Sequence, residues 1–298
     1  MKSISKPLTC GYIFNSWLES LSAENYKPNT ITGYKGAVNN YFIPYFKKMP
    51  ASELQSHPSL QDFFDELQNA RNQKGTVHSS KNLHNLKNIL SKSLHFAVQQ
   101  GWLSFNISNH ILIPENNEKA LRYISEQEVL RIQAELCGQI DNVSLAIQLI
   151  LHTGIELGEL MALTWSDIDL QEQSITVSKQ QVSSAPGRSI EAYDPNSSRY
   201  RTIPLSKSLI QYLSSFPQDQ SKTVIYREGR TQYDNSAFGK IIASKMKDMG
   251  VTASATLLRN TFGMALFRMD IPYMEIMRVM GYSLGSNIAR KFLIASRS

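Results

Sequence analysis

The chain has 298 residues, of which 42% are hydrophobic and 19% charged, so it is long enough for two globular domains and too apolar for a disordered protein. Its formal net charge of +6 suits a polyanionic partner, although this excess is modest for the length. The two cysteines, Cys10 and Cys137, provide no disulfide framework and no zinc-binding spacing, and no apolar stretch is long enough to cross a membrane. We therefore expect a soluble, cytoplasmic protein without a metal site.

The first half of the chain has apolar residues at helical spacing, which predicts four helices. The first carries Trp17, the second begins at Pro28, the third carries Phe63, and the fourth opens at Ser80 and ends at Gly101. The polar face of the fourth helix is basic and has no acidic residue. That face is either an ordinary solvated surface or a surface for nucleic acid.

A polar segment from Ile111 to Lys119, which includes a proline, reads as a linker. It places a domain boundary between residues 113 and 114. The second half then mixes helices with strands, beginning with a capping box at Ser125–Glu128. A buried helix is expected at residues 143–152, and later helices at 236–249, 257–269, 273–280 and from Ile288 onward. Strands are expected at residues 174–182, 201–205 and 224–226, with a polar loop between the first two.

Colinear motifs in both halves resemble those of the tyrosine recombinases, also called phage integrases. The first half has Trp17-Leu-Glu19, Lys27-Pro-Asn-Thr30 followed by Tyr34, and the stretch from Asn88 to Leu103. The second half has His152-Thr-Gly-Ile-Glu-Leu-Gly-Glu-Leu-Met-Ala-Leu-Thr-Trp-Ser-Asp-Ile-Asp169, Arg201-Thr-Ile-Pro-Leu205, Thr256-Leu-Leu-Arg-Asn-Thr-Phe262 and Ile276-Met-Arg-Val-Met-Gly-Tyr-Ser283. The resemblance implies a mainly α fold. Residues 1–113 would be a helical core-binding (SAM-like) domain, and residues 114–298 an α+β catalytic-type domain with a small antiparallel sheet.

The resemblance also implies a chemistry. In this family a tyrosine hydroxyl attacks a DNA phosphate, forming a 3′-phosphotyrosyl link. Two arginines, together with histidine or tryptophan donors, stabilise the charge that develops on the phosphate oxygens. A lysine on a β-hairpin protonates the leaving oxygen. This reaction needs neither a metal nor another cofactor.

Most positions that match this machinery carry the wrong residue. Glu156 stands where the family has its first arginine, Thr256 replaces a histidine, and Phe292 stands at the nucleophile. Tyr282 occupies the histidine-or-tryptophan position, where its hydroxyl would either donate to a phosphate or simply pack. Arg259 is retained and is our candidate phosphate contact, with a structural arginine as the alternative. Because residues 283–298 contain no tyrosine, we expect covalent catalysis to be lost and the protein to be a pseudoenzyme.

The hairpin lysine is not fixed by the sequence. Lys179 lies on the expected strand and is either the general acid or a surface residue. Many relatives place this lysine shortly before the Arg-Thr-Ile-Pro stretch, where this chain has Asn196 in a segment without lysine.

The state of the pocket depends on where the Glu156 carboxylate points. If Glu156 pairs with Arg259, the protein's own charge fills the phosphate site. If it points away, another arginine, such as Arg188 or Arg199, is available to turn into the pocket.

The resemblance implies that both domains grip duplex DNA, chiefly through its phosphates. In the first half, the candidate contacts are the polar residues of the second and fourth helices, namely Lys27, Thr30, Tyr34, Lys35, Lys81, His84 and Lys87. The C-terminal segment, with Ile288 and Phe292, either covers its own core or packs onto a second copy or another recombinase.

Three functions are compatible with these features. The favoured one is an inactive family member that binds a specific DNA site as a regulator or accessory factor. The second is an active site-specific integrase that recombines DNA. The third is a remnant or protein-interaction scaffold without a specific DNA site.

Overall fold

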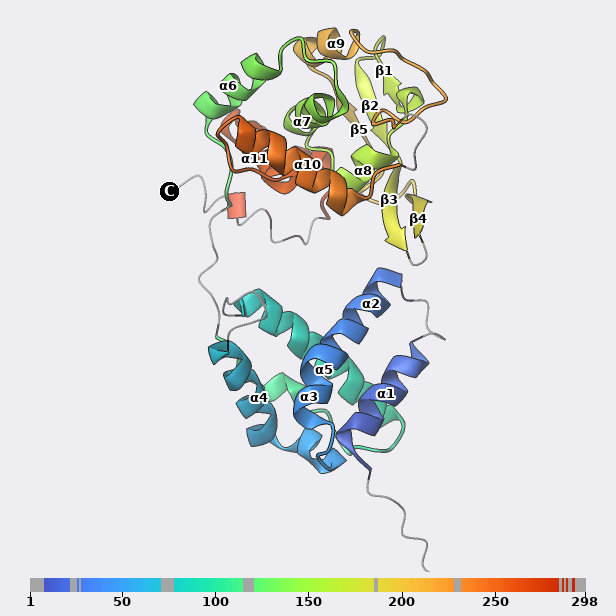
Figure 1. The fold of residues 1–298 in the computed structure, drawn as a ribbon, viewed down its shortest axis with the longest axis vertical. Coiled ribbons are helices and arrows are strands. Elements are labelled where there is room, and N and C mark those ends of the chain that lie inside the picture. The colour runs from blue at the N-terminus through green and yellow to red at the C-terminus, as the bar shows by residue number, and fades with distance from the viewer. Residues whose placement is uncertain are drawn as a thin grey trace, which may run out of the picture. The chain divides into compact units, whose positions relative to one another are not determined.

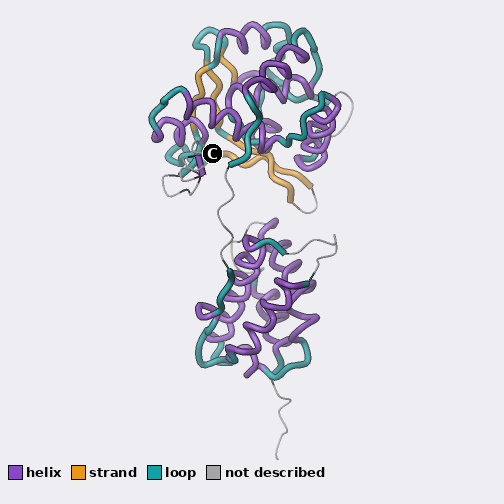
Figure 2. Tube along the Cα trace, turned by 90° about the vertical axis from the view of Figure 1, so that its left-hand side faces the viewer, coloured by secondary structure: helices purple, strands orange, loops and turns teal. Residues whose placement is uncertain are grey.

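The computed structural model describes residues 8–21, 26, 28–70, 78–114, 121–184, 187–227, 232–283, 286, 288 and 291–292. The chain divides into two compact units, residues 1–117 and 118–298, each with its own hydrophobic core (Figure 1). Among the described residues, no helix has both the length and the apolar character that a membrane span needs. Figure 2 shows that the strands belong to the second unit alone.

The first unit is helical, as the apolar spacing predicted. Its helices are α1 (Cys10–Ser20), α2 (Pro28–Ala37), α3 (Ile43–Phe46), α4 (His57–Asn69) and α5 (Ser80–Gln99), and a π-helical turn at Val38–Phe42 joins α2 to α3. The Ser79 hydroxyl caps α5 by accepting from the Asn82 N–H at 3.2 Å, and Gly101 follows the helix with a φ of +71°. The aromatic residues of α1, α3 and α4 fill the core.

The second unit is built around α7 (Asn142–Thr153), which is buried along most of its length and contacts four other helices. These are α6 (Glu126–Leu136), α9 (Lys207–Leu213), α10 (Asn235–Asp248) and α11 (Ala255–Arg268). The short α8 (Leu157–Ala162) and α12 (Tyr273–Met280) complete the labelled helices. The expected capping box is present, because Ser125 and Glu128 exchange backbone-to-side-chain hydrogen bonds at the start of α6.

The strands differ from the expectation, and the short β1 was not expected at all. The run at residues 174–182 is two strands, β2 (Ser174–Val177) and β3 (Lys179–Ser184), because its pairing partner changes at Ser178. β2 lies between β1 (Ile168–Asp169) and β5 (Arg201–Pro204) in an antiparallel sheet, whereas β3 forms a hairpin with β4 (Gly187–Ala192).

The segment expected as a polar loop therefore contains β4. Its residues are almost all exposed, so no apolar alternation marks it as a strand. The prediction of a strand at residues 224–226 was wrong as well. Among the described residues of this segment, only an isolated bridge between Thr164 and Thr223 forms.

The described end of the chain packs onto its own unit. α12 ends at Gly281, and Ile288, Lys291 and Phe292 are again helical. Phe292 is 1% exposed and joins a small cluster of Leu121, Met264, Ile276 and Met280. This arrangement matches the alternative in which Phe292 covers its own core.

Candidate functional site

The connection from α7 to α8 positions Glu156. α7 ends at Gly154, whose φ is +62° and where a Cβ atom would lie 2.5 Å from the Phe262 ring, so this tight exit needs glycine. Two residues later, Glu156 is the N-cap of α8, and its N–H donates to Glu159 Oε2 at 2.9 Å. The Glu156 side chain reaches toward Arg259 on α11.

Arg259 on α11 is 5% exposed, and its guanidinium is held from several sides. Nη1 donates to the Gly154 carbonyl and Nη2 to the Met280 carbonyl. Nη2 also lies 3.2 Å from Glu156 Oε1, and Nε donates to the Tyr282 hydroxyl at 3.3 Å. Because an arginine has five N–H bonds, these four contacts leave little donor capacity for a ligand while Glu156 is in place.

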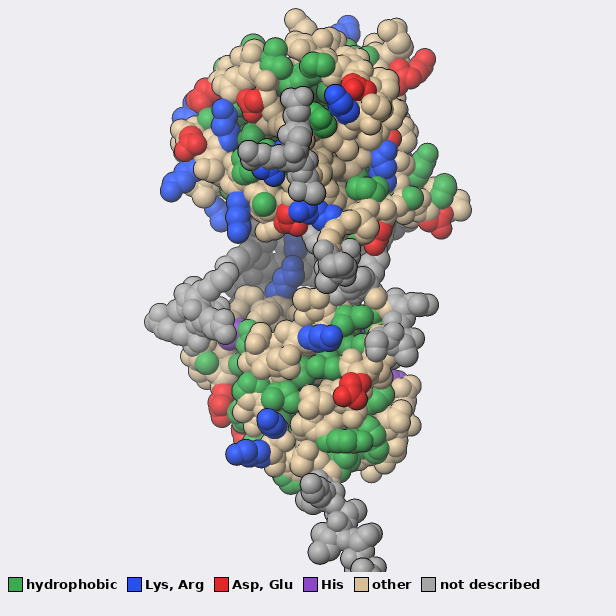
Figure 3. Space-filling model, turned by 45° about the vertical axis from the view of Figure 1, so that its right-hand side comes forward, with side chains coloured by type: hydrophobic (Ala, Val, Ile, Leu, Met, Phe, Trp, Pro, Cys, Tyr) green, Lys and Arg blue, Asp and Glu red, His purple; other side chains and the backbone are tan. Residues whose placement is uncertain are grey.

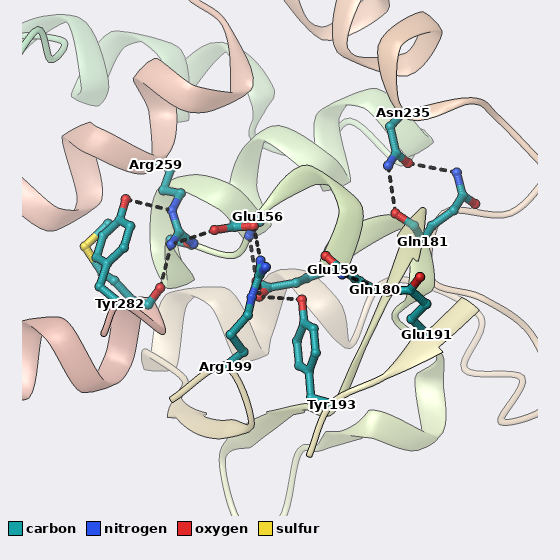
Figure 4. A network of polar contacts seen from close by, with 12 residues as sticks. Glu156, Glu159, Gln180, Gln181, Glu191, Tyr193, Arg199, Asn235, Arg259 and Tyr282 are labelled. Carbon is teal, nitrogen blue, oxygen red and sulfur yellow. Dashed lines mark hydrogen bonds and ion pairs between the residues drawn. The ribbon is translucent and has the colours of Figure 1, made fainter. Parts of the chain in front are cut away.

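Glu156 is shared between two arginines. While Oε1 faces Arg259, Oε2 accepts from Nη2 of Arg199, which lies between β4 and β5 (Figure 4). The Arg199 guanidinium also stacks 4.9 Å from the centre of the Tyr193 ring. Burial works against the charge of Arg199, but the neighbouring Glu156 carboxylate and other acidic groups raise its pKa. The structure thus shows the first expected alternative, in which Glu156 pairs with Arg259 and does not point away. Arg199 also turns inward, but it contacts the same carboxylate instead of replacing it.

The other proposed arginine does not reach this cluster. Arg188 on β4 donates to the Gln232 carbonyl instead.

A second, fully buried ion pair lies behind the first. Glu159 and Arg201 make two hydrogen bonds, and Arg201 Nε donates to the Val279 carbonyl at 2.7 Å. Burial raises the pKa of Glu159, but the hydrogen bonds and charge of Arg201 outweigh it, and the net pKa is lowered. Arg201 was not predicted as the partner of Glu159. The signal in the sequence that could have revealed this partner was the position of Arg201 at the start of a short apolar strand.

Tyr282 packs and hydrogen-bonds at once. Its ring lies 4.8 Å from the Arg259 guanidinium carbon, and its hydroxyl receives the Arg259 Nε–H. Phe292 is not among the residues that line the cavity beside Arg259. It stacks on Phe267 at 6.4 Å between ring centres, and it fills the space next to Gly263.

Lys179 is held at the base of the hairpin. Its Nζ lies 2.7 Å from Asp167 Oδ2 and 3.2 Å from the Thr164 hydroxyl. Asn196 lies exposed in a turn, where its N–H donates to Asp194. Neither Lys179 nor Asn196 lines the cavity beside Arg259.

That cavity has a volume of about 560 Å³. Glu156, Arg259 and Tyr282 form one part of its wall, and exposed Thr256 and Lys240 form another. Over the part of the chain that the structure describes, no three His, Cys, Asp or Glu side chains gather as a metal site would require.

In the first unit, Lys35, Lys81 and His84 are exposed, as a contact surface requires, and Thr30 is half-buried. The remaining candidates, Tyr34, Lys87 and Lys27, are differently placed. Tyr34 packs against Trp17 and Tyr26, Lys87 donates to the Ile111 carbonyl at 2.7 Å, and Lys27 lies outside the described residues. On the face drawn in Figure 3, basic and acidic side chains are interspersed and form no single basic patch.

The basic face of α5 continues beyond the candidate contacts, which end at Lys87, toward the C-terminal end of the helix. Lys92 and His95 are exposed there, and the Lys92 ammonium lies 5.7 Å from the centre of the Tyr26 ring. They continue at helical spacing from Lys81 and His84, which was the signal that could have identified them.

Comparisons with known proteins agree with this fold. Residues 122–291 match the model of the phage integrase family, and residues 9–68 match that of the phage integrase N-terminal SAM-like domain. A tyrosine recombinase XerC-like protein of Caldanaerobacter subterraneus subsp. tengcongensis is 26% identical over 281 residues, covering 89% of this chain and 68% of that protein. The ICEBs1 integrase of Bacillus subtilis is 22% identical over 196 residues, covering 66% of this chain and 51% of that protein, so the chain matches about half of its length.

Two solved structures share the fold. The Tn1549 transposon integrase in complex with transposon right end DNA has a TM-score of 0.79 at 17% identity, covering 97% of this chain and 98% of that chain. The lambda integrase tetramer bound to a Holliday junction has a TM-score of 0.70 at 15% identity, covering 97% of this chain and 78% of that chain. Since the family match covers more than half of the residues, the chain belongs to the phage integrase family, that of the tyrosine recombinases.

Proposed function

We propose that this protein binds a specific duplex DNA site, as a regulator or accessory factor, and does not cut it. Residues 1–113 would serve as the core-binding domain and residues 114–298 as a catalytic-type domain without activity. Support for DNA binding comes from the family and from the Tn1549 and lambda integrases, whose structures contain DNA. No cofactor is needed for such binding.

The observation that carries the loss of activity is the Glu156 carboxylate between Arg259 and Arg199. Phosphoryl transfer requires preorganised cationic donors aimed at the oxygens where charge develops. Here the two guanidiniums are directed at a protein carboxylate instead. Phe292 adds a second loss, since its ring carries no hydroxyl to attack a phosphate.

For the DNA surface, we propose contacts through the exposed cations of α2 and α5, with the others in supporting roles. The full set in the first unit is Lys27, Thr30, Tyr34, Lys35, Lys81, His84 and Lys87. Arg259, the further candidate in the second unit, is 5% exposed and paired with Glu156, so it would contact a phosphate only if Glu156 moved away. Tyr34 would act by packing beneath the surface.

One observation favours the alternative of an active integrase. The Tyr282 hydroxyl accepts a hydrogen bond from Arg259, so a phenol does lie beside the retained arginine. In that alternative Tyr282 would be the nucleophile.

The test has two steps. Selection of bound sequences from a random duplex pool, followed by salt titration, should yield an enriched site with salt-dependent affinity. A nicked suicide duplex carrying that site should then give no covalent protein–DNA adduct. An adduct that disappears in the Tyr282→Phe variant would establish the active alternative, and the absence of any enriched sequence would favour a scaffold.

A further inference from the structure

Two arginines from different parts of the second unit converge on one carboxylate. Arg259 comes from α11 and Arg199 from the connection between β4 and β5, and they contact different oxygens of Glu156 (Figure 4). The charges of these three side chains sum to +1, and without the carboxylate they would sum to +2. A guanidinium on each of two neighbouring anionic oxygens is an arrangement that suits a phosphate group equally well.

The arginines are held independently of Glu156. Arg259 keeps its bonds to the Gly154 and Met280 carbonyls, and Arg199 keeps its stacking on Tyr193. Removal of the carboxylate would therefore leave two oriented cations rather than two relaxed ones.

Glu156 and Arg199 are the exposed members of the group. The Glu156 side chain is 38% exposed and that of Arg199 is 37% exposed, against 6% for Arg259. An ion pair as exposed as Glu156–Arg199 contributes little, so this contact does not lock the carboxylate in place. The cavity of about 560 Å³ is lined by Glu156, Arg259 and the exposed Lys240, which gives an anion a route to Arg259. Arg199 does not line this cavity, but its side chain is itself open to solvent.

We propose that Arg199 and Arg259 form an oxyanion site for one phosphate group, and that Glu156 is a built-in anion that holds this site closed. The ligand class is a phosphate or phosphodiester, and Arg199 supplies the second cation in place of the residue at position 156. This inference rests on the proposed function where it takes the phosphate to be one of DNA, but the site itself is testable without DNA.

The experiment compares binding of inorganic phosphate by the whole chain and by the Glu156→Gln variant, using calorimetry at constant ionic strength. Glutamine keeps the length of the side chain, and the backbone bond from position 156 to Glu159 is unaffected. We expect the variant to bind phosphate at least about tenfold more tightly, since one anion no longer competes for the arginines. The double variant Glu156→Gln/Arg199→Gln should lose this gain.

A matched control removes the same charge elsewhere. Glu275 pairs with Arg278 at 2.7 Å on the surface of α12, so Glu275→Gln raises the net charge equally without touching the cavity. Equal phosphate affinities for the natural chain and Glu156→Gln would overturn the proposal, and so would equal gains from Glu156→Gln and Glu275→Gln. If Glu156→Gln does not fold, Glu156→Ser replaces it, because a serine hydroxyl can cap α8.

The two proposals fail in different assays. A covalent adduct with DNA would overturn the proposed inactivity and leave the phosphate result standing. Unchanged phosphate affinity would overturn the closed site and leave specific DNA binding standing.

Discussion

Glu159 and Arg201 form a buried ion pair with two parallel hydrogen bonds, of 2.9 Å from Nη1 to Oε1 and 2.8 Å from Nη2 to Oε2. Both side chains are at most 2% exposed. Arg201 also donates to the Val279 carbonyl, so the pair joins α8, β5 and the end of α12. Glu156 and Tyr282, at the ends of those helices, therefore depend on this pair for their positions beside Arg259.

Glu159→Gln should strongly destabilise the second unit. The substitution leaves the Arg201 guanidinium buried without a compensating charge, and breaking such a pair costs about 3–5 kcal/mol. Urea unfolding would measure the loss. As a control, Lys179→Gln breaks a pair with Asp167 whose side chains are 25% and 13% exposed, and it should cost about 1 kcal/mol or less. Equal losses for the two variants would contradict this ranking.

The same carboxyl predicts a dependence of stability on pH. Burial raises the pKa of Glu159, but Arg201 lowers it further, so the folded value lies below the ordinary 4.5. A depressed folded pKa gives stability that is fully present above 4.5 and is lost as the pH falls through the lower, folded value. Thermal unfolding between neutral pH and acid should show a steeper loss below 4.5 for the natural chain than for Glu159→Gln. Parallel curves would contradict the assignment.

Phe292→Tyr should not restore strand cleavage. The new hydroxyl would enter a site that is 1% exposed, between Phe267 and Gly263, while Arg259 stays bound to Glu156. A buried hydroxyl without a partner costs about 1–3 kcal/mol, so we expect lower stability and no covalent adduct on a suicide duplex. An adduct formed by this single variant would show that Glu156 does not block the chemistry.

Lys81→Gln should reduce the salt dependence of DNA binding. Lys81 is exposed on α5, and loss of one phosphate contact lowers the slope of log affinity against log salt by about one. Lys87→Gln is the matched variant on the same helix. Because the Lys87 ammonium donates to the Ile111 carbonyl at 2.7 Å, its loss should lower stability by about 1 kcal/mol and change the slope less. A larger change of slope for Lys87→Gln than for Lys81→Gln would mean that DNA contacts the Lys87 side of α5.

The two thiols should differ in reactivity. Burial raises the pKa of Cys10 to about 12, whereas Cys137 is exposed. At mildly alkaline pH the folded protein should therefore react with a disulfide reagent at one thiol, and Cys137→Ser should remove that reaction. Two reactive thiols in the folded state would show that α1 opens readily.

The sequence predicted the longer helices well because burial sets their pattern, but it did not predict the short α8 and α9. The apolar run at residues 143–152 became α7, and residues 273–280 became α12 with the same bounds. The strands were harder to predict, because the alternation of side chains along one strand does not show which other strand pairs with it. β2 and β3 therefore looked like one strand, and the exposed β4 left no pattern at all.

The motifs alone placed this chain in its family and identified the unusual residues at positions 156 and 292, since those depend only on residue identity and order. The direction in which Glu156 points was decided only by tertiary structure. Residues 156, 199 and 259 are far apart in sequence, and their meeting depends on how α8, α11 and the connection before β5 pack. Charge pairing between such elements has no periodicity that a sequence could reveal, so the contacts of Glu156 with both Arg199 and Arg259 came from the fold.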